Sequence, residues 1–456
     1  MSHQKHAKHH IKNTPNITSH LIPNIPFDTI SHMKAYKSRI FDTILKEALE
    51  AKGAVLIQGP KWCGKTTTAE QVAKSVLYMS DPERIGQNLL AADAKPSILL
   101  KGDSPRLIDE WQIAPKLWDA IRFDVDHSDI LGKFILTGSA VPADKEKIHH
   151  TGTGRFAWLT MRPMSLFESN ESTGGVSLED LFSGNTELGE SYSHTLESIA
   201  FLACRGGWPQ SIDMNKKAAL RQAFDYIDAV ANNDISRVDK IQRDPMIARR
   251  LLKSLARLQG TQSAVSVIRA DMAPNQPKDF HENTIHAYIG ALKKIFVVED
   301  MEAWCPNLRC KTPVRTTDTR YFSDPSIATA AMGIGPEELM DDLPTFGFIF
   351  ETLSVRDLRS YAAALDGSVY HYKDKSGLEC DAVIHLRNGK YGLVEIKLGG
   401  ELLIEEGVKS LNALASAIDT KRMRHPSFKM IIVATGDFAY QRSDGIIICP
   451  IGALKP

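Results

Sequence analysis

The chain has 456 residues, of which 43% are apolar and 24% charged, and its 55 basic residues balance its 55 acidic ones. This length corresponds to about two to four domains, and the zero net charge excludes a global attraction to nucleic acid. No apolar run reaches the ~18 residues that a membrane span needs, and the polar N-terminus lacks the apolar core of a secretory signal, so we expect a cytoplasmic protein without membrane contact.

Residues 1–33 are rich in histidine and predict a disordered tail, with a weak metal-binding tract as the alternative. Six cysteines scattered over this length do not resemble a disulfide framework. Cys305 and Cys310 lack a second matching pair, which argues against a zinc site.

From Tyr36 onward, apolar residues at helical spacing predict a first helix that ends at Gly53. The short apolar run AVLIQ at 54–58 then predicts a buried parallel strand. A glycine loop follows, and the run TTAEQVAKSVL after it predicts a helix. Two further buried strands are PRLIDE, which leads into Asp109, and KFILTGS, which leads into Thr137.

Alternating strands and helices predict the α/β fold class, with a parallel sheet and helices on both of its faces. In such sheets the ligand lies beyond the carboxyl ends of the strands. The glycine loop after residue 58, the acidic residues at Asp109 and the hydroxyl residues at Thr137 each follow the end of a predicted strand. We therefore expect these three segments to form one site.

The glycine loop fills the pattern G-x-x-x-x-G-K-[ST] and predicts a P-loop. Its glycines let backbone N–H groups surround a phosphate, and the next helix adds its positive end. Lys65 would place a charge against the β and γ phosphates, and Thr66 would ligate magnesium. The alternative is a glycine turn with a surface lysine. The predicted cofactors are ATP and Mg²⁺, and the predicted nucleotide-binding residues are Gly59, Pro60, Lys61, Trp62, Cys63, Gly64, Lys65, Thr66 and Thr67.

Asp109 and Glu110 follow the P-loop at the end of the next apolar run. We expect Asp109 to hold Mg²⁺ and Glu110 to orient and activate the attacking water. An exposed acidic pair is the alternative. Trp62 and Trp111 lie beside these motifs, and we favour a place in the core over stacking on a base.

Thr137 and Ser139 end the third strand, where a hydroxyl can contact the γ-phosphate or the attacking water; ordinary turn chemistry is the alternative. Arg155 is a candidate arginine finger, because the transition state needs a cation beyond Lys65. Arg162 and Arg205 compete for that role, and a structural role is open for each arginine.

Several of these runs together resemble a known family. They are YKSRIFD, GAVLIQGPKWCGKTTTA, RLIDEWQ, FILTGSA, GRFAWLTMRPMSLFE and RGGWPQS. They resemble a widespread prokaryotic AAA-type ATPase family whose members carry a C-terminal domain of unknown function. The resemblance covers nearly the whole chain after the tail. It implies an AAA-type core, a helical or winged-helix middle and a nuclease-like C-terminal fold, and it favours ATP over GTP.

Four domains are therefore expected: the tail at 1–33, a P-loop core at 34–195, a helical and winged-helix-like domain at 196–340, and a nuclease-like domain at 341–456. Residues 170–195 are rich in Ser, Gly, Glu and Asn and predict a mobile connection.

A second cluster of polar residues lies near the C-terminus. Glu395 and Lys397 share one face of a predicted strand, Asp381 lies on the probable neighbouring strand, and Glu351 lies on a predicted helix. This order resembles the PD-(D/E)xK nuclease superfamily, which implies phosphodiester hydrolysis. Asp381 and Glu395 would then hold magnesium and Lys397 would stabilise the attacked phosphate. The alternative is a cross-face ion pair of small value.

Basic residues supply a candidate DNA contact. If residues 247–300 form a winged helix, the helix at 282–294 would be its reader. A plain amphipathic helix with a solvated basic face is the alternative. The basic residues are Arg237, Lys240, Arg243, Arg249, Arg250, Lys253, Arg257, Arg309, Lys311, Arg315 and Arg320.

These observations predict a magnesium-dependent ATPase that couples hydrolysis to rearrangement of its C-terminal module, with DNA as a candidate partner. One alternative is a nucleotide-gated binding switch with negligible turnover. Another is a metal-dependent nuclease regulated by ATP. A homo-oligomer and an unidentified protein partner are both open.

Overall fold

The computed structural model describes residues 35–139, 152–272, 281–306, 317–421 and 423–456, and contacts join the chain from Lys37 onward into one unit. Several residues singled out above lie outside the described residues: the tail, Arg309, Cys310, Lys311 and Arg315. Among the described helices, none has both the length and the hydropathy of a membrane span. Cys305 is disulfide-bonded, whereas four buried cysteines are free: Cys63, Cys204, Cys380 and Cys449.

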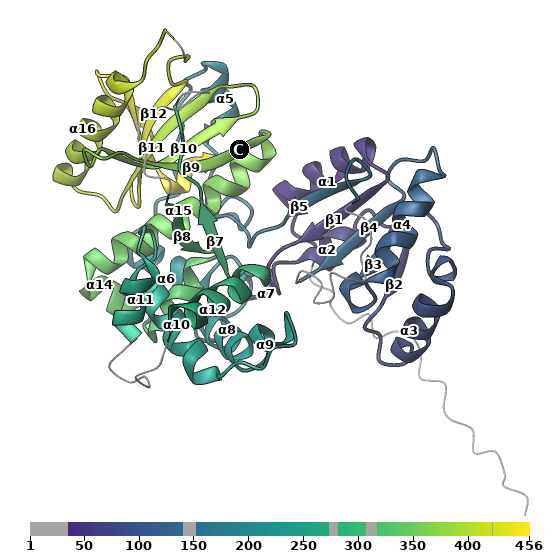
Figure 1. Ribbon diagram of the computed structural model, residues 1–456. Coiled ribbons are helices and arrows are strands. Elements are labelled where there is room, and N and C mark those ends of the chain that lie inside the picture. Colours follow the sequence, from purple (N-terminus) through teal and green to yellow (C-terminus); the bar gives the residue numbers. More distant parts are fainter. Residues whose placement is uncertain (1–34, 140–151, 273–280, 307–316, 422) are drawn as a thin grey trace, which may run out of the picture. The chain divides into compact units, whose positions relative to one another are not determined.

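The N-terminal part is built on a five-stranded sheet with the strand order β2-β3-β4-β1-β5, and each neighbouring pair in it is parallel (Figure 1). The predicted α/β class is confirmed. The strands are β1 (Ala54–Gln58), β2 (Ser75–Tyr78), β3 (Arg106–Asp109), β4 (Phe134–Gly138) and β5 (Phe156–Thr160).

Helices cover both faces of this sheet, as predicted. Because successive strand residues point to opposite faces, Val55 packs in one cluster with Leu45, and Leu56 packs in another with Trp118. The first cluster lies under α1 and the second under α4. The helices of this part are α1 (Ile40–Ala51), α2 (Lys65–Glu70), α3 (Ile85–Ala94) and α4 (Lys116–Asp126), with short 3₁₀ turns at Pro96–Ile98 (η1) and Trp111–Ile113 (η2).

The helix predicted for TTAEQVAKSVL is wrong in its second half. Helix α2 ends at Glu70, and Ser75–Tyr78 forms β2 instead. Val76 pairs with Leu107 of β3 in parallel register. Branched and aromatic side chains suit a strand, and sheet pairing here overrides the local helical spacing.

The middle of the chain is mainly helical, as predicted from residue 196 onward. It also contains an antiparallel hairpin of β7 (Val298–Met301) and β8 (Thr319–Phe322), and an isolated β-bridge links Thr261 to Arg320 of β8. The helices are α6 (Leu196–Arg205), α7 (Pro209–Ile212), α8 (Lys216–Ala229), the π-helical turn Val230–Asp234, α9 (Ile235–Arg237), α10 (Pro245–Arg257), α11 (Val265–Met272), α12 (Glu282–Lys294), α13 (Pro325–Met332) and α14 (Pro336–Asp341).

In the C-terminal part, Glu351 lies on a helix and Asp381 and Glu395 lie on neighbouring strands, as predicted. The six-stranded sheet of this part has the order β13-β14-β12-β11-β10-β9, with β9, β10 and β11 antiparallel and β11, β12 and β14 parallel. The elements are α15 (Leu343–Ala364), β9 (Gly367–Lys373), β10 (Glu379–Leu386), β11 (Tyr391–Lys397), α16 (Glu401–Ala417), β12 (Phe428–Val433), β13 (Tyr440–Gln441), β14 (Ile446–Pro450), a 3₁₀ turn at Ile451–Ala453 and β15 (Leu454–Lys455).

The segment 170–195, predicted as a mobile connection within the P-loop core, packs against the C-terminal part instead. Its strand β6 (Val176–Ser177) pairs with β15, and α5 (Leu178–Ser183) follows. Ser172 Oγ donates to the Leu454 carbonyl at 2.7 Å, and Tyr192 N donates to the Gly452 carbonyl at 3.0 Å. The polar residues that suggested a loop thus supply the hydrogen bonds that fix the segment.

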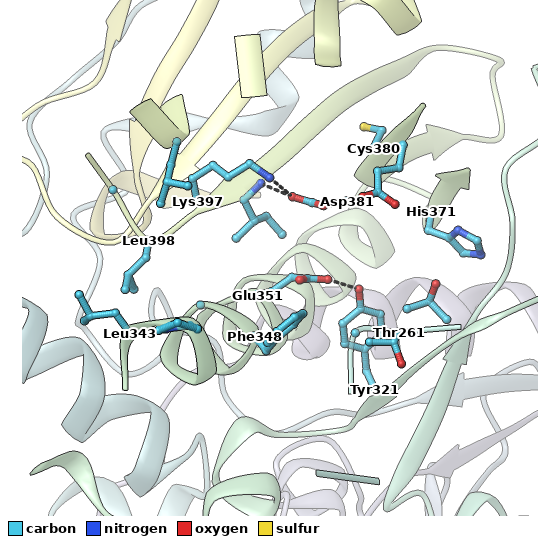
Figure 2. Close-up of a pocket in the computed structure, with 18 of the residues that line it drawn as sticks. Thr261, Tyr321, Leu343, Phe348, Glu351, His371, Cys380, Asp381, Lys397 and Leu398 are labelled. Carbon is cyan, nitrogen blue, oxygen red and sulfur yellow. Dashed lines mark hydrogen bonds and ion pairs between the residues drawn. The ribbon is translucent and has the colours of Figure 1, made fainter. Parts of the chain in front are cut away.

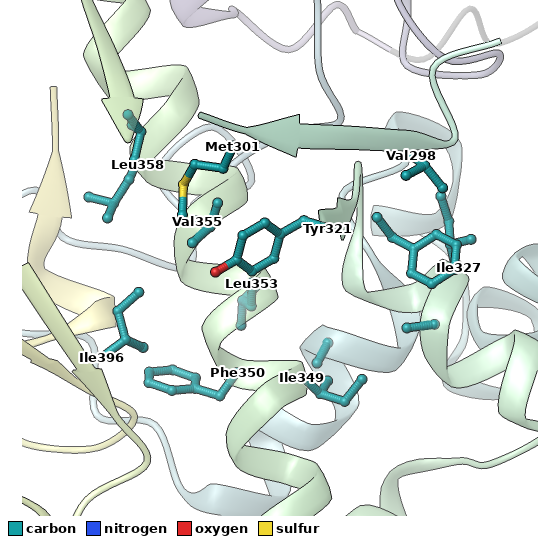
Figure 3. Close-up of a cluster of buried hydrophobic side chains, with 14 of the residues drawn as sticks. Val298, Met301, Tyr321, Ile327, Ile349, Phe350, Leu353, Val355, Leu358 and Ile396 are labelled. Atoms are coloured by element: carbon teal, nitrogen blue, oxygen red, sulfur yellow. The ribbon is translucent and has the colours of Figure 1, made fainter. Parts of the chain in front are cut away.

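Helix α15 is buried along most of its length. Figure 3 shows its side chains between residues of the β7–β8 hairpin, such as Met301 and Tyr321, and Ile396 of β11. Arg356 of this helix is also buried, and it pairs with Asp324 at 3.0 Å and with Asp357 at 2.8 Å. The core of the protein therefore contains an ionic cluster as well as apolar side chains.

Replacing the cation of this cluster should destabilise the fold strongly. Arg356→Met leaves two buried carboxylates without their partner, a change that typically costs about 3–5 kcal/mol. The midpoint of urea unfolding should fall accordingly. Arg221→Met, which removes an exposed arginine that pairs with Asp225 at 3.6 Å, is the control and should cost less than about 1 kcal/mol. Equal midpoints for the two variants would contradict the prediction.

Candidate functional site: a P-loop and a carboxylate–lysine cluster

The P-loop leaves β1 and wraps back on itself before α2. Gly59 is needed sterically, since a Cβ there would lie 2.1 Å from the Met161 carbonyl oxygen, and Gly64 has a left-handed φ of 100°. Lys65 is only 7% exposed, and its Nζ donates to the carbonyls of Gly59 (3.0 Å) and Pro60 (2.7 Å). The ammonium group is therefore held inside the loop, where a polyphosphate would lie.

Asp109 lies at the end of β3, and two hydroxyls donate to its Oδ1. They are Thr66 Oγ1 and Thr137 Oγ1, each at 2.7 Å. Neighbouring oxygen ligands of an octahedral Mg²⁺ lie roughly 3 Å apart, so Thr66 and Asp109 fit one such ion. Thr137 is buried and its hydroxyl orients the Asp109 carboxylate, while the catalytic role expected for it stays a prediction.

Glu110 follows Asp109 in a left-handed conformation with φ 55°. Such a conformation is uncommon for a residue with a side chain and is often found at functional sites. Gln112 Nε2 donates to its Oε2, and Ser139 Oγ donates to its Oε1 at 3.4 Å. Burial, and then the charge of Asp109, raise the pKa of Glu110. The sequence reasoning missed Gln112, although its position two residues after the acidic pair was a usable signal.

Arg39 is a further residue that the sequence reasoning missed. Its side chain is buried and donates to the carbonyl of Cys63 in the P-loop and to that of Arg162, each at 2.8 Å, and it pairs with Glu168 at 2.9 Å. Arg39 therefore fixes the P-loop to the segment after β5. The usable signal was a lone arginine just before the first helix.

The candidate arginine fingers occupy three different environments. Arg155 directly precedes β5, whereas the P-loop follows β1, and the two strands are parallel with Ala54 opposite Phe156. Arg155 thus lies at the opposite edge of the sheet, where it pairs with Asp126, and it does not reach the P-loop of its own chain. Of the other two, Arg162 pairs with Glu299 and the buried Arg205 pairs with Glu171.

The two tryptophans beside the nucleotide motifs, Trp111 and Trp62, differ in how far they are exposed. Trp111 is 2% exposed, as its expected place in the core requires. Trp62 is 45% exposed and meets the edge of Tyr226 with ring centroids 5.5 Å apart, so the core interpretation is wrong for it. Its neighbour Lys61 pairs with Asp234 at 2.7 Å. Both side chains of the loop therefore face the helical part rather than the sheet.

The carboxylate–lysine cluster of the C-terminal part forms where β10 and β11 meet. Lys397 Nζ lies 2.6 Å from Glu395 Oε2 and 3.2 Å from Asp381 Oδ2, and the Ile396 amide donates to Asp381 at 2.8 Å. Asp381 and Lys397 line a cavity of about 950 Å³, together with Glu351 of α15 (Figure 2). The predicted juxtaposition of these four residues is present.

Burial dominates the electrostatics of this cluster. Burial, and then Asp381, raise the pKa of Glu351 to about 8 and hold that of Glu395 well above its usual value. Burial lowers the pKa of Lys397, but the two carboxylates outweigh it and raise the pKa above its usual value. Tyr321, another residue missed from the sequence, donates its hydroxyl to Glu351.

The carboxylate oxygens of this cluster are possible ligands for a metal ion. Glu395 Oε1 is buried and has no hydrogen-bond partner among the described residues, so it is free to ligate. Within those residues no three His, Cys, Asp or Glu side chains converge as a metal cage. Two carboxylates suffice for Mg²⁺, which usually keeps several waters or phosphate oxygens.

The basic residues expected to attract DNA are partly neutralised within the fold. Arg243 pairs with Asp239, Arg249 with Asp228, and Arg257 with Asp271. Their charges serve the packing of neighbouring helices. The basic face of α10 therefore carries less uncompensated positive charge than its sequence suggested.

Comparison with known proteins bears on the P-loop part. Residues 51–170 match the model of an AAA domain. This part of the chain is therefore similar to an AAA domain. Outside the AAA domain, residues 196–338 match a domain of unknown function (DUF8612), and residues 346–454 match another (DUF4143).

Relatives extend beyond the AAA domain. An uncharacterized protein of Mycobacterium tuberculosis is 24% identical over 416 residues, which cover 89% of this chain and 82% of the relative. An uncharacterized protein of Mycobacterium bovis gives the same figures.

Two solved structures are similar at a low level. A Walker-type ATPase of Pyrococcus abyssi has a TM-score of 0.39 at 14% identity, covering 64% of this chain and 94% of that one. The ORC1 protein of Aeropyrum pernix, solved in complex with DNA, has a TM-score of 0.23 at 12% identity, covering 64% and 90%.

Proposed function

We propose that this chain binds ATP with Mg²⁺ at the P-loop and hydrolyses it. One observation carries the proposal: the Thr66 hydroxyl and the Asp109 carboxylate, 43 residues apart in the chain, meet at 2.7 Å next to the buried Lys65. A hydroxyl, a carboxylate and an ammonium group are the set that a magnesium-bound polyphosphate needs. Magnesium, when bound there, would neutralise charge on the β and γ phosphates.

Each residue of the site then has a role. Lys65 exchanges its loop carbonyls for phosphate oxygens, and the backbone amides of the loop bind the same phosphates. Glu110 accepts a proton from the attacking water, and its raised pKa makes it a better base than an ordinary carboxylate. Thr137 holds Asp109 in place, and Gln112 holds Glu110.

Lys65→Ala tests the site. Loss of one charged contact to phosphate, worth about 1.5–3 kcal/mol, should weaken ATP binding about 10- to 100-fold. Titration calorimetry with Mg·ATP measures the binding, and phosphate release with and without duplex DNA measures turnover and its dependence on a nucleic-acid partner. Lys74→Ala, which removes an exposed lysine of the same domain, should change neither. Unaltered ATP affinity in Lys65→Ala would refute the assignment.

A chain of contacts supports coupling of the AAA domain to the C-terminal part. Arg39 joins the P-loop to Glu168, and the nearby Leu166 amide donates to Asp357 of α15 at 3.0 Å. The same helix carries Glu351 of the carboxylate–lysine cluster. We infer that movement of the P-loop on hydrolysis is transmitted along this path. Arg39→Lys keeps the charge but not the three contacts. This variant should still hydrolyse ATP, but the carboxylate–lysine cluster should no longer respond to hydrolysis.

A second activity, phosphodiester hydrolysis, is proposed for the carboxylate–lysine cluster. It is favoured by the meeting of Asp381 and Lys397, from two strands, at one cavity, with the buried Glu395 paired to Lys397 behind them, in the order that the PD-(D/E)xK resemblance implied. Asp381 and Glu395 would hold Mg²⁺, which would polarise the attacked phosphate. Lys397 would stabilise the negative charge that develops on it.

DNA is the proposed partner, and a winged helix is its proposed reader. Helices α10, α11 and α12 precede the β7–β8 hairpin, and the bridge from Thr261 adds a third strand position to it, which is the element order of a winged helix. The exposed face of α12 carries Asn283, His286 and Lys294. These side chains can donate to base edges and phosphates. DNA-independent ATP turnover together with undetectable DNA binding would contradict this proposal.

A further inference from the structure

The cavity at the carboxylate–lysine cluster has a second wall that the proposed chemistry does not use. Besides the polar residues, it is lined by apolar side chains that include Leu343, Phe348 and Leu403. These three are 48%, 45% and 42% exposed, although each is large and apolar. A contiguous set of exposed apolar residues around a cavity marks a binding surface.

The apolar wall and the polar cluster are close together because one helix contributes to both. Phe348 and Glu351 are three residues apart on α15, so they lie on the same helix face. Figure 2 shows both on this helix, with Asp381 and Lys397 across the cavity. Next to the ring, Gly347 leaves open space, since a Cβ there would meet no atom within 4 Å.

The volume limits what can enter. About 950 Å³ is at the upper end of the range of roughly 300–1,000 Å³ in which proteins hold drug-sized ligands. One or two nucleotides fit this volume, whereas a double helix does not. A nucleotide also matches both walls, because Lys397 offers a cation to its phosphate and Phe348 offers a ring to the flat face of its base.

We propose that this cavity takes a nucleotide unit of single-stranded DNA, with the base on the Phe348 ring and the phosphate at Lys397. The inference rests on the proposed phosphodiester hydrolysis and names its substrate class. A paired duplex keeps its bases within the stack, so it can offer a phosphate to the polar cluster but no base to the apolar wall. Single strands, frayed ends and flipped-out nucleotides satisfy both.

Binding of a short fluorescein-labelled oligo(dT) to the full-length protein, with Ca²⁺ in place of Mg²⁺, tests the proposal by fluorescence anisotropy. Phe348→Ala should weaken binding about 5- to 150-fold, the range expected for loss of one base–aromatic stack, and leave duplex binding unchanged. Phe348→Trp should retain affinity, and Phe348→Leu, which preserves apolar volume but removes the ring, should lose it. Phe123→Ala, an exposed phenylalanine of the AAA domain, is the matched control.

Three outcomes would overturn the proposal: equal oligo(dT) affinity in Phe348→Ala and wild type, an equal loss for duplex, or displacement by free dTMP as effective as by the oligonucleotide. The last outcome would assign the cavity to a free nucleotide. The proposed phosphodiester hydrolysis is tested separately, by measuring whether Lys397→Ala still cuts DNA. If Lys397→Ala stops cutting while Phe348→Ala binds oligo(dT) normally, the nuclease stands and the single-strand inference fails.

Discussion

Glu110→Gln is expected to stop ATP turnover while ATP remains bound. The amide has the size of the carboxylate but cannot accept a proton from water, and loss of a general base lowers turnover about 100- to 10,000-fold. The phosphate-binding groups, Lys65 and the loop amides, are unchanged. Phosphate release should therefore fall in this range, while calorimetry with Mg·ATP should give an affinity close to that of wild type.

The control for this variant is Glu47→Gln, an exposed carboxylate on α1 of the same domain, which should leave both measurements unchanged. Wild-type turnover in Glu110→Gln would remove Glu110 from the mechanism. A different result, tight ATP binding without phosphate release in wild type itself, would favour a nucleotide-gated switch over an ATPase.

Lys397→Ala is expected to abolish cutting of DNA at the C-terminal cluster, by about 100- to 1,000-fold, the effect of removing one group that stabilises transition-state charge. The substitution acts in two ways. It removes the cation from the attacked phosphate. It also leaves Asp381 and Glu395 facing each other without a counter-charge, which raises the pKa of Glu395 further and weakens metal binding.

Cleavage of a labelled single strand in Mg²⁺, followed on denaturing gels, measures this effect, and EDTA should stop the reaction in wild type. Lys409→Ala removes an exposed lysine from α16 and should cut at the wild-type rate. Cleavage that survives Lys397→Ala, or that persists in EDTA, would rule out the proposed chemistry. The C-terminal part would then be a binding module.

Much of the fold could be predicted from the sequence, because many strands and helices of this chain have a recognisable pattern of apolar and glycine residues within a short stretch. The P-loop is one contiguous segment, so its strand, loop and helix follow from spacing within a short stretch. The C-terminal order from α15 to β12 follows from periodic apolar residues in the same way. Both clusters of candidate site residues therefore have a local signal in the sequence.

Other features depend on contacts between distant segments, which local spacing does not encode. Arg39 meets Glu168 across 129 residues, and the segment 170–195 finds its partner in the last strand. The strand β2 replaced a predicted helix because β3 was there to pair with it. Sheet pairing and burial, not propensity, decided these elements.

The sequence by itself therefore determined which chemical groups this protein carries and in which local elements they lie, since a motif and its periodicity are properties of adjacent residues. Only the tertiary structure decided how those groups are used. Parallel register put Arg155 at the wrong edge of its own sheet, Thr137 was turned against Asp109, and Phe348 was left exposed beside Glu351. Each of these outcomes follows from packing between elements far apart in the chain, where distance and orientation have no sequence signal.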